Sequence, residues 1–228
     1  MNDLKLRHEL KFYIDYSDYL AIRTRLRAIA KLDPNVSEDG TYFIRSLYFD
    51  NYRDKALREK IDGVNVREKF RIRYYNHDTS RITLEKKSKI HGMCKKVQTP
   101  VSIEQCQALV DGDLSRIKDS NDPLLIELYR KMLDQRIIPR VIVDYIREPY
   151  IYEYGNVRIT FDSKIRTGLY SKQFLSSDVP MIDAGDNGTI IMEVKFDEYL
   201  PEVIQLAVQI GNRSQTAFSK YAACRMYG

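Results

Sequence analysis

The sequence has no tryptophan, only three cysteines and three histidines, and no long apolar run. Cys94, Cys106 and Cys224 form no CxxC pair and leave one cysteine over, which argues against a zinc ribbon and favours a reducing compartment. The histidines have no metal-ligand spacing. No segment approaches the ~20 consecutive apolar residues of a membrane-spanning helix, and the first ten residues lack the apolar stretch of a signal peptide. We therefore expect a cytoplasmic chain without a transmembrane segment.

What the chain does contain is typical of a globular protein. Of its 228 residues, 43% are hydrophobic and 30% are charged, which excludes a disordered tail. There is no internal repeat, no low-complexity tract and no clear linker, so we expect one domain over residues 1–228. The net charge of +5 is modest and does not by itself indicate nucleic acid or another polyanion as a partner. The distribution of the positive charge is more informative than its sum.

Alternating polar and apolar residues dominate the chain and predict seven or eight β-strands, mostly in hairpin order. The predicted strands are 6–15, 42–49, 66–75, 81–88, 93–101, 139–147, 157–161 and 190–196. Helices are predicted between and after them. The first is 18–31, with Ser17 as its N-cap. The segment 51–60 predicts one or two helical turns. A capping box of Ser102 and Gln105 and the pair Asp122–Pro123 open two more helices, and 201–210 and 217–226 are expected to close the chain. This order predicts an α+β fold with an antiparallel sheet that closes towards a barrel.

Charge gathers on one alternate face of strand after strand. Each of five or six predicted strands carries an acidic and one or two basic residues at this spacing, where an ordinary solvated face would show the pattern once or twice. The recurring sets are Arg7, Glu9 and Lys11; Arg71 and Arg73; Thr83, Glu85 and Lys87; Tyr145 and Arg147; Arg158, Thr160 and Asp162; and Glu193 and Lys195. In a closed sheet one alternate face must point inward. Unpaired charge inside would cost several kcal/mol per ion, so we expect a wet tunnel that takes a polyanion and a divalent cation.

Eight segments in order give the chain a resemblance to a known family. RHELKFYI, RSLYFDN, REKFRIRYY, LEKKSKIHG, VDYIREPY, VRITFD, IMEVKF and FSKY run from Arg7 to Tyr221. Together they resemble the VTC-type polyphosphate polymerase domain, a member of the triphosphate tunnel metalloenzyme superfamily, which also contains the CYTH-type proteins. The resemblance implies an eight-stranded antiparallel β-barrel with packing helices. It also implies transfer of the γ-phosphoryl group of ATP to a growing polyphosphate, with Mn²⁺ or Mg²⁺ as the cofactor.

The resemblance also implies roles for individual residues. The residues expected to bind phosphate are Lys11, Arg71, Arg73, Lys87, Lys96, Arg147, Arg158 and Lys220, with hydrogen bonds from Tyr145 and Ser219. Within this set, Arg71, Arg73, Lys87 and Lys220 are the expected catalytic residues. Glu193 is the main expected metal ligand, accompanied by Glu9 and Asp162. For Asp162 a turn residue at a strand end is an equal alternative, and Glu85 is expected to orient arginines.

Two positions distinguish this chain within the superfamily. Relatives with an ExExK motif place an acidic residue where this chain has Arg7, and the resulting RxExK favours the VTC branch over the CYTH branch. The yeast-type domain has a second lysine in the closing helix, where this chain has Ala217, with Arg213 nearby as a substitute. One cation fewer makes polymerase activity a weaker inference than phosphate binding.

Three functions therefore stay open. The first is an ATP-dependent polyphosphate polymerase, and the second is a triphosphatase of the same fold that hydrolyses inorganic or nucleoside triphosphates. The third is a module that binds polyphosphate or nucleotide without catalysis. Nucleic acid is not an expected partner, whereas a membrane protein acting in trans is compatible with all three.

Overall fold

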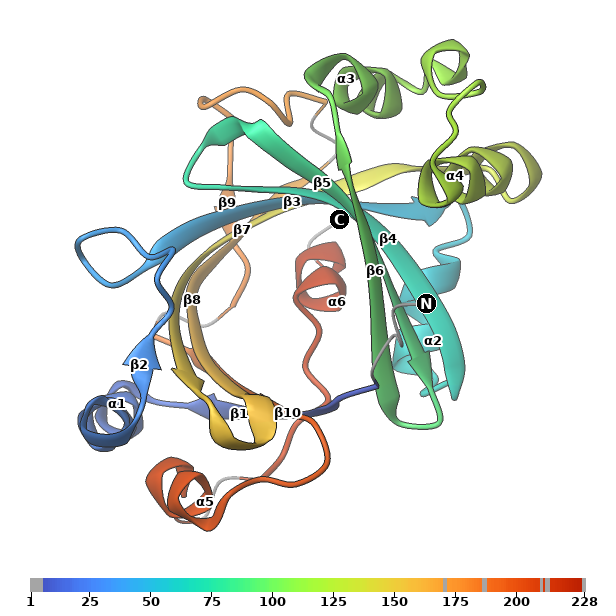
Figure 1. Cartoon of the computed structure of the whole chain (residues 1–228). Helices are drawn as coiled ribbons and strands as arrows, with labels where there is room; N and C mark the ends of the chain where they lie inside the picture. The colour runs from blue at the N-terminus through green and yellow to red at the C-terminus, as the bar shows by residue number, and fades with distance from the viewer. Residues whose placement is uncertain (1–5, 170–171, 186–187, 210, 212–213, 227–228) are drawn as a thin grey trace.

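One antiparallel sheet dominates the computed structural model, which describes residues 6–169, 172–185, 188–209, 211 and 214–226. The sheet curls strongly around a central space (Figure 1). Within the described residues, its main path has the order β1-β10-β8-β7-β3-β4-β5-β6. These strands are β1 (His8–Ile14), β3 (Tyr42–Asn51), β4 (Val66–Tyr75), β5 (Asp78–Ile90), β6 (Met93–Val101), β7 (Ile137–Tyr152), β8 (Val157–Leu169) and β10 (Ile190–Phe196). The short strands β2 (Lys31–Leu32) and β9 (Ile182–Asp183) pair with β7 and β8.

The two edges of the curled sheet meet at a single bridge. The backbone N–H of Arg7 donates to the carbonyl of Cys94, and that of Cys94 donates back, each over 3.3 Å. This bridge joins the start of β1 to β6, so the eight strands of the main path form an open barrel. The predicted α+β class and the eight-stranded antiparallel barrel are therefore confirmed.

Strands β7 and β8 are longer than the sequence pattern predicts. The prediction ended β7 at residue 147 and β8 at residue 161, but they continue to Tyr152 and Leu169. The pairing of the two strands shifts register between Asp144 and Ile146, and Lys164 has a left-handed φ of 51°. A bulge of this kind resets which residues point inward, and it hides a continuous strand from a test for strict alternation.

Six α-helices lie among the described residues. They are α1 (Tyr16–Ile29), α2 (Lys55–Ile61), α3 (Ile103–Asp111), α4 (Pro123–Asp134), α5 (Glu202–Val208) and α6 (Lys220–Arg225), and two 3₁₀ turns are η1 (Leu114–Arg116) and η2 (Tyr154–Asn156). The predicted capping box of Ser102 and Gln105 opens α3, and Asp122 caps α4 ahead of Pro123, as predicted. No helix of the described residues is long and apolar enough to cross a membrane.

Two predicted helix starts are wrong. Helix α1 starts at Tyr16 because Asp15, and not Ser17, is the N-cap, in a reciprocal capping box with Asp18. Helix α6 starts at Lys220 and not at 217, because the Ser219 hydroxyl accepts the N–H of Ala222 as the N-cap. Residues 214–218 are not helical, and Thr216 donates its N–H to the carbonyl of Lys11 over 2.8 Å.

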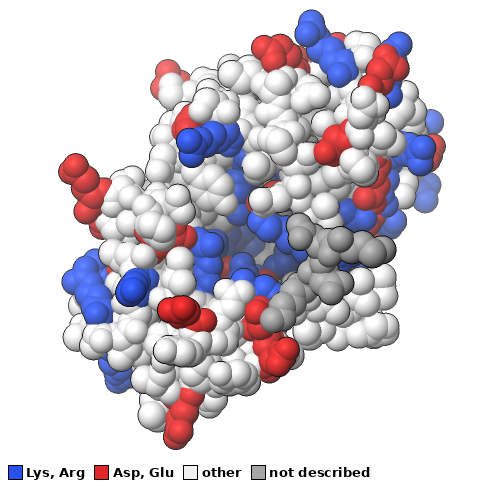
Figure 2. Space-filling view, viewed as in Figure 1, with Lys and Arg blue, Asp and Glu red and all other residues white. Residues whose placement is uncertain are grey.

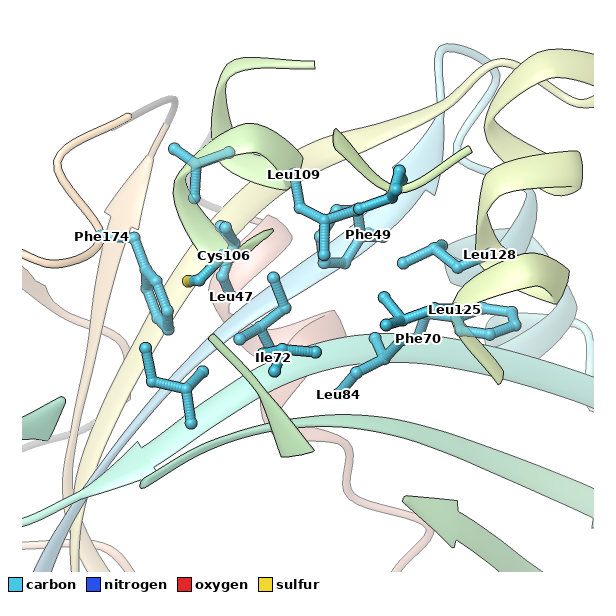
Figure 3. Packing of buried hydrophobic residues seen from close by; sticks show 14 of the residues in the cluster. Leu47, Phe49, Phe70, Ile72, Leu84, Cys106, Leu109, Leu125, Leu128 and Phe174 are labelled. Carbon is cyan, nitrogen blue, oxygen red and sulfur yellow. The ribbon is translucent and has the colours of Figure 1, made fainter. Parts of the chain in front are cut away.

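Two hydrophobic clusters cover the outside of the barrel. The larger one lies under α3 and α4, where Phe49, Phe70 and Leu84 of the sheet pack against Leu109 and Leu125 (Figure 3). The second lies under α1 and α5 and contains the following buried residues: Ile22, Leu26, Ile159, Val194 and Ile204. Because these helices take up the apolar outer face, the opposite alternate face of each strand is turned towards the central space.

A third cluster fills part of that central space. Helix α6 lies inside the curl of the sheet (Figure 1), and its Tyr221 and Cys224 pack with Tyr48, Val143 and other residues of β3, β7 and β8. Tyr221 also donates to Asp50 Oδ2 over 2.6 Å. The apolar side of α6 is thereby anchored to β3, and its first residue, Lys220, projects into the polar part of the interior.

Candidate functional site: a charged tunnel

The polar face of the barrel lines a hollow that contains most of the predicted site residues. Figure 2 shows lysine and arginine side chains gathered in a depression at the centre of this view, with acidic side chains among them. The pairing explains the gathering: Arg71 lies opposite both Tyr48 and Glu85, and Arg73 lies opposite Ser46. Around the barrel, Lys11 lies opposite Glu193 and Arg147 lies opposite Asp162. We call this lining the tunnel.

Arg71 and Arg73 project from β4 into one wall of the tunnel. Arg71 is paired with Glu85, with 2.6 Å between Nε and Oε2. The Nε of Arg73 donates to Ser46 Oγ over 2.9 Å, and its NH2 donates to the hydroxyl oxygen of Tyr145 over 2.8 Å. Arg73 is therefore held mainly by neutral groups, with Glu85 4.0 Å away, so much of its charge is not compensated by the protein.

Two glutamates and two lysines form a second charged cluster, which joins β1 and β10 to β5. Lys11 Nζ lies 2.9 Å from Glu9 Oε1 and 3.5 Å from Glu193 Oε1, so it bridges the two carboxylates. The other oxygen of Glu9 pairs with Lys87 over 2.5 Å, and Glu193 Oε2 lies 3.4 Å from Arg147. The sequence placed these residues on four strands, and the barrel brings them into one cluster.

Asp162 is the most deeply buried carboxylate of the tunnel. It is inaccessible to solvent, and Arg147 donates two hydrogen bonds to it, of 2.6 and 2.7 Å. Lys220 Nζ approaches Asp162 Oδ2 to 2.5 Å and lies 4.8 Å from the ring centre of Tyr145. The alternative that Asp162 is a turn residue at a strand end is wrong, because β8 continues past it to Leu169.

The remaining predicted residues lie towards the rim. Lys96 is half exposed and contacts Glu85 over 3.2 Å. Arg158 donates to Asp33 over 2.6 Å and to the hydroxyl oxygen of Tyr42 over 2.7 Å. Ser219 serves as the N-cap of α6, which orients Lys220. Ala217 lies before α6 and not inside it, and Arg213, its expected substitute, falls outside the described residues.

The tunnel keeps its carboxyl groups ionised. Burial alone would raise their pKa values, but the surrounding cations outweigh it: Lys11 and Lys87 lower the pKa of Glu9 to about 2. The pKa of Glu193 lies well below its usual range because of Lys195, Lys11 and Arg147. Arg71 lowers that of Glu85 and Arg147 lowers that of Asp162 in the same way. These four carboxylates therefore carry negative charge at neutral pH.

The donor set fits a divalent metal that arrives with its substrate. Among the described residues no three metal-ligating side chains converge into a ready-made cage. Glu9 and Glu193 nevertheless present ionised oxygens on one wall, linked through Lys11. Mg²⁺ commonly uses one or two carboxylates and completes its shell with water and substrate phosphates. All of these carboxylates are engaged by cations, but the cations lie 3.4–3.5 Å from the oxygens of Glu193 and 2.5–2.7 Å from those of Asp162, so Glu193 suits this role better.

Sequence reasoning overlooked the contribution of β3. Tyr48 accepts a hydrogen bond from Arg71 over 2.9 Å, and Tyr42 holds Arg158. Both tyrosines and Ser46 occupy alternate positions on the tunnel face of this strand. The aromatic residues of YFIRSLYF are typical of a core strand, but their alternation with a period of two indicated that one face of the strand is turned towards the tunnel.

Comparisons with known proteins agree with this architecture. A protein from Hippeastrum, described as a candidate adenylyl cyclase with a dominant triphosphatase activity, has a TM-score of 0.58 and 14% identity, over 98% of this chain and 96% of that one. A candidate adenylate cyclase from Bacillus halodurans has a TM-score of 0.51 and 12% identity, over 89% and 86% of the two chains. At these identities the likeness shows a shared fold. No curated protein matches the chain significantly.

The sequence itself matches a family model along nearly its whole length. The model is that of the VTC domain, and it matches residues 6–227, from just before the bridge at Arg7 to just after α6. The resemblance that the eight segments indicated is confirmed: the chain belongs to the VTC domain family.

Proposed function

We propose that this protein binds triphosphate or polyphosphate in the tunnel together with Mn²⁺ or Mg²⁺ and transfers the terminal phosphoryl group of ATP to a phosphate acceptor. The observation that carries this proposal is the convergence of basic side chains from seven strands and α6 on one hollow. They are Lys11, Arg71, Arg73, Lys87, Lys96, Arg147, Arg158, Lys195 and Lys220. A flexible phosphate chain carries roughly one negative charge per phosphate and matches such a lining.

In this proposal the protein contributes position and charge. The Arg71 and Arg73 guanidinium groups bind non-bridging phosphoryl oxygens, and Lys220 and Lys87 neutralise charge at the reacting phosphate. Glu193, with Glu9, would hold the metal, which would supply Lewis-acid stabilisation of the negative charge on the phosphate. An oxygen of the acceptor phosphate forms a bond to the γ-phosphorus as the bond to the β-phosphate oxygen breaks, and ADP leaves with that electron pair.

The carboxylates favour a phosphate acceptor over water. Glu9, Glu85, Asp162 and Glu193 are each held by at least two cations, and their pKa values are lowered. Such carboxylates are weak bases and are poorly suited to remove a proton from water. A phosphate acceptor is already ionised at neutral pH and needs no base, which supports polymerase over triphosphatase.

Hydrolysis stays the second candidate function. The Hippeastrum protein that shares the fold is described by a dominant triphosphatase activity. Glu9 could orient a water molecule without deprotonating it, because its carboxylate borders Lys87, one of the proposed phosphate-binding residues.

The products distinguish these functions. The purified protein is incubated with ATP and Mn²⁺ or Mg²⁺, and the phosphorus products are resolved on a gel and by ³¹P NMR. We expect a ladder of polyphosphate with a matching amount of ADP. Free phosphate without polymer would replace the polymerase by a triphosphatase. Binding of tripolyphosphate without turnover would leave a binding module, and absence of both would contradict the proposal.

Arg73 offers a direct test of phosphate binding. We expect Arg73→Ala to weaken binding of tripolyphosphate by roughly 1.5–3 kcal/mol, because it removes a charged hydrogen-bond donor whose charge is little compensated by the protein. Isothermal titration calorimetry measures the effect. Arg81→Ala, at an exposed arginine of β5, is the matched control and should leave the affinity unchanged. Equal affinities for wild type and Arg73→Ala would remove Arg73 from the site.

A further inference from the structure

Lys69 is a basic residue of the tunnel that the proposed reaction does not use. It precedes Arg71 by two positions on β4 and therefore faces the same way. Its partner across the sheet is Lys87 of β5. Like charges directly opposite each other in an antiparallel pair are destabilising, and Lys87 is compensated by Glu9 whereas Lys69 is not.

No carboxylate forms an ion pair with Lys69 among the described residues. The charged groups that act most strongly on it are Arg71 on its own strand, Lys87 on β5 and Lys11 on β1. Asp50 of β3 and Lys55 and Glu59 of α2 line the same pocket, but neither carboxylate forms an ion pair with Lys69. Its ammonium group instead lies 5.3 Å from the ring centre of Tyr48 on β3. Lys69 is only partly buried, so its side chain borders the hollow and not the hydrophobic core.

Tyr48 is surrounded in a complementary way. Only 2% of its surface is exposed, and its ring contacts Tyr221 of α6 with 5.2 Å between centres. Its hydroxyl oxygen accepts from Arg71 over 2.9 Å. Lys69 and Arg73 add to the positive charge around it, and the neighbouring carboxylate, Glu85, is bound to Arg71. The phenol therefore lies beside Lys69 as a group that can supply negative charge.

We propose that Lys69 is a further phosphate-binding residue of the tunnel, whose resting neighbour is the Tyr48 ring, and that a proton from solvent is taken up by this pair when a phosphoryl group binds beside it. This inference rests on the proposed function, because it needs a phosphate chain in the tunnel. The Tyr48–Lys69 pair makes the grip on that chain dependent on pH.

The electrostatics of the pair agree with this geometry. Burial lowers the pKa of Lys69 to about 7. The positive charges of Lys87, Lys11 and Arg71 also lower this pKa, whereas the Tyr48 oxygen raises it. Burial would raise the pKa of Tyr48, but Arg71, Lys69 and Arg73 outweigh it and lower that pKa to about 7. Above neutral pH, and without bound phosphate, the pair therefore carries one proton fewer than the state in which Lys69 is an ammonium and Tyr48 is a phenol.

A bound phosphate reverses this balance. Its negative charge favours the ammonium form of Lys69 and disfavours the phenolate form of Tyr48, so it raises both pKa values. Between the lower pKa values of the empty tunnel and the higher ones of the filled tunnel, binding takes up protons. By linkage, the affinity falls as pH rises through that window, by at most about tenfold per pH unit for each proton taken up.

Calorimetry of tripolyphosphate binding tests the proposal. Titrations at about pH 8 in two buffers of different ionisation enthalpy give the number of protons taken up on binding. Because tripolyphosphate itself titrates, the comparison is between wild type and Lys69→Met at the same pH. We expect Lys69→Met to take up fewer protons, to lose the steeper pH dependence and to bind roughly tenfold more weakly. Lys118→Met, at an exposed lysine just after η1, controls for the change in net charge.

A spectroscopic measurement on wild type does not depend on the stability of the variant. The chain has 17 tyrosines, and an ordinary tyrosine has a pKa of about 10. We expect wild type to show tyrosinate absorbance at about pH 8. Tripolyphosphate should remove this absorbance, and Tyr48→Phe should lack it. Binding with the same proton uptake in wild type and Lys69→Met, or without any loss of tyrosinate, would overturn this inference alone. Absence of tripolyphosphate binding by wild type would overturn the proposed function as well.

Discussion

Replacing Asp162 with asparagine should lower the free energy of unfolding by about 3–5 kcal/mol, the scale seen when one partner of a buried ion pair is removed. Asp162 is fully inaccessible and compensates two cations at once, the bidentate Arg147 and Lys220. Asparagine has nearly the same volume, so packing changes little. The loss comes from leaving two buried positive charges against one neutral amide.

Urea denaturation of wild type and Asp162→Asn, followed by circular dichroism, measures this loss. Asp119→Asn is the matched control, because Asp119 is 86% exposed and pairs loosely with Lys118 over 3.9 Å. The control should change stability by less than about 0.5 kcal/mol. A similarly small change for Asp162→Asn would show that the Arg147–Asp162–Lys220 cluster does not support the barrel.

Glu193→Gln should have the largest effect on turnover, a loss of roughly a hundredfold or more, which corresponds to the several kcal/mol that a metal supplies in charge stabilisation. Glu193 is the proposed main metal ligand, and Lys11, Lys195 and Arg147 keep it ionised. Glutamine retains the shape but offers the metal a neutral oxygen in place of a charged one. The fold should survive, since Glu9 and Asp162 still compensate Lys11 and Arg147.

The informative measurement is ATP turnover as a function of Mn²⁺ concentration, together with a thermal melt of each variant. Glu198→Gln, at an exposed glutamate that follows Glu193 closely in the sequence, is the control and should match wild type. A higher Mn²⁺ requirement in Glu193→Gln with an unchanged melting temperature is the expected pattern. Wild-type turnover at low Mn²⁺ would remove the metal assignment from Glu193.

The predicted placement of side chains on the two faces of a strand was correct where strict alternation holds. Arg71 and Arg73 were placed on one face by their spacing, and they project into the same wall. Local capping signals were equally direct, since Ser102 with Gln105 and Asp122 with Pro123 open their helices as predicted. These features depend on backbone geometry within a few residues, which the local sequence controls.

The errors arose where distant contacts decide the outcome. The strand that carries Asp162 continues through a bulge, because pairing with β7 supports it beyond the point at which the alternation breaks. Helix α6 starts later than its composition suggests, because the residues before it pair with Lys11 and Phe12 of β1. Neither partner can be identified from the local sequence.

For this protein, the sequence by itself determined the strand periodicity, the charged face, an antiparallel sheet that curls towards a barrel, and membership of the VTC domain family. Only the tertiary structure decided how those charges combine: Lys11 bridges two glutamates, Asp162 joins Arg147 to Lys220, and Lys69 is left with Tyr48. Alternation specifies the face on which a side chain lies, because it depends on adjacent backbone units. Which charges meet across a barrel depends on register, bulges and the position of α6, and these follow from packing over the whole chain.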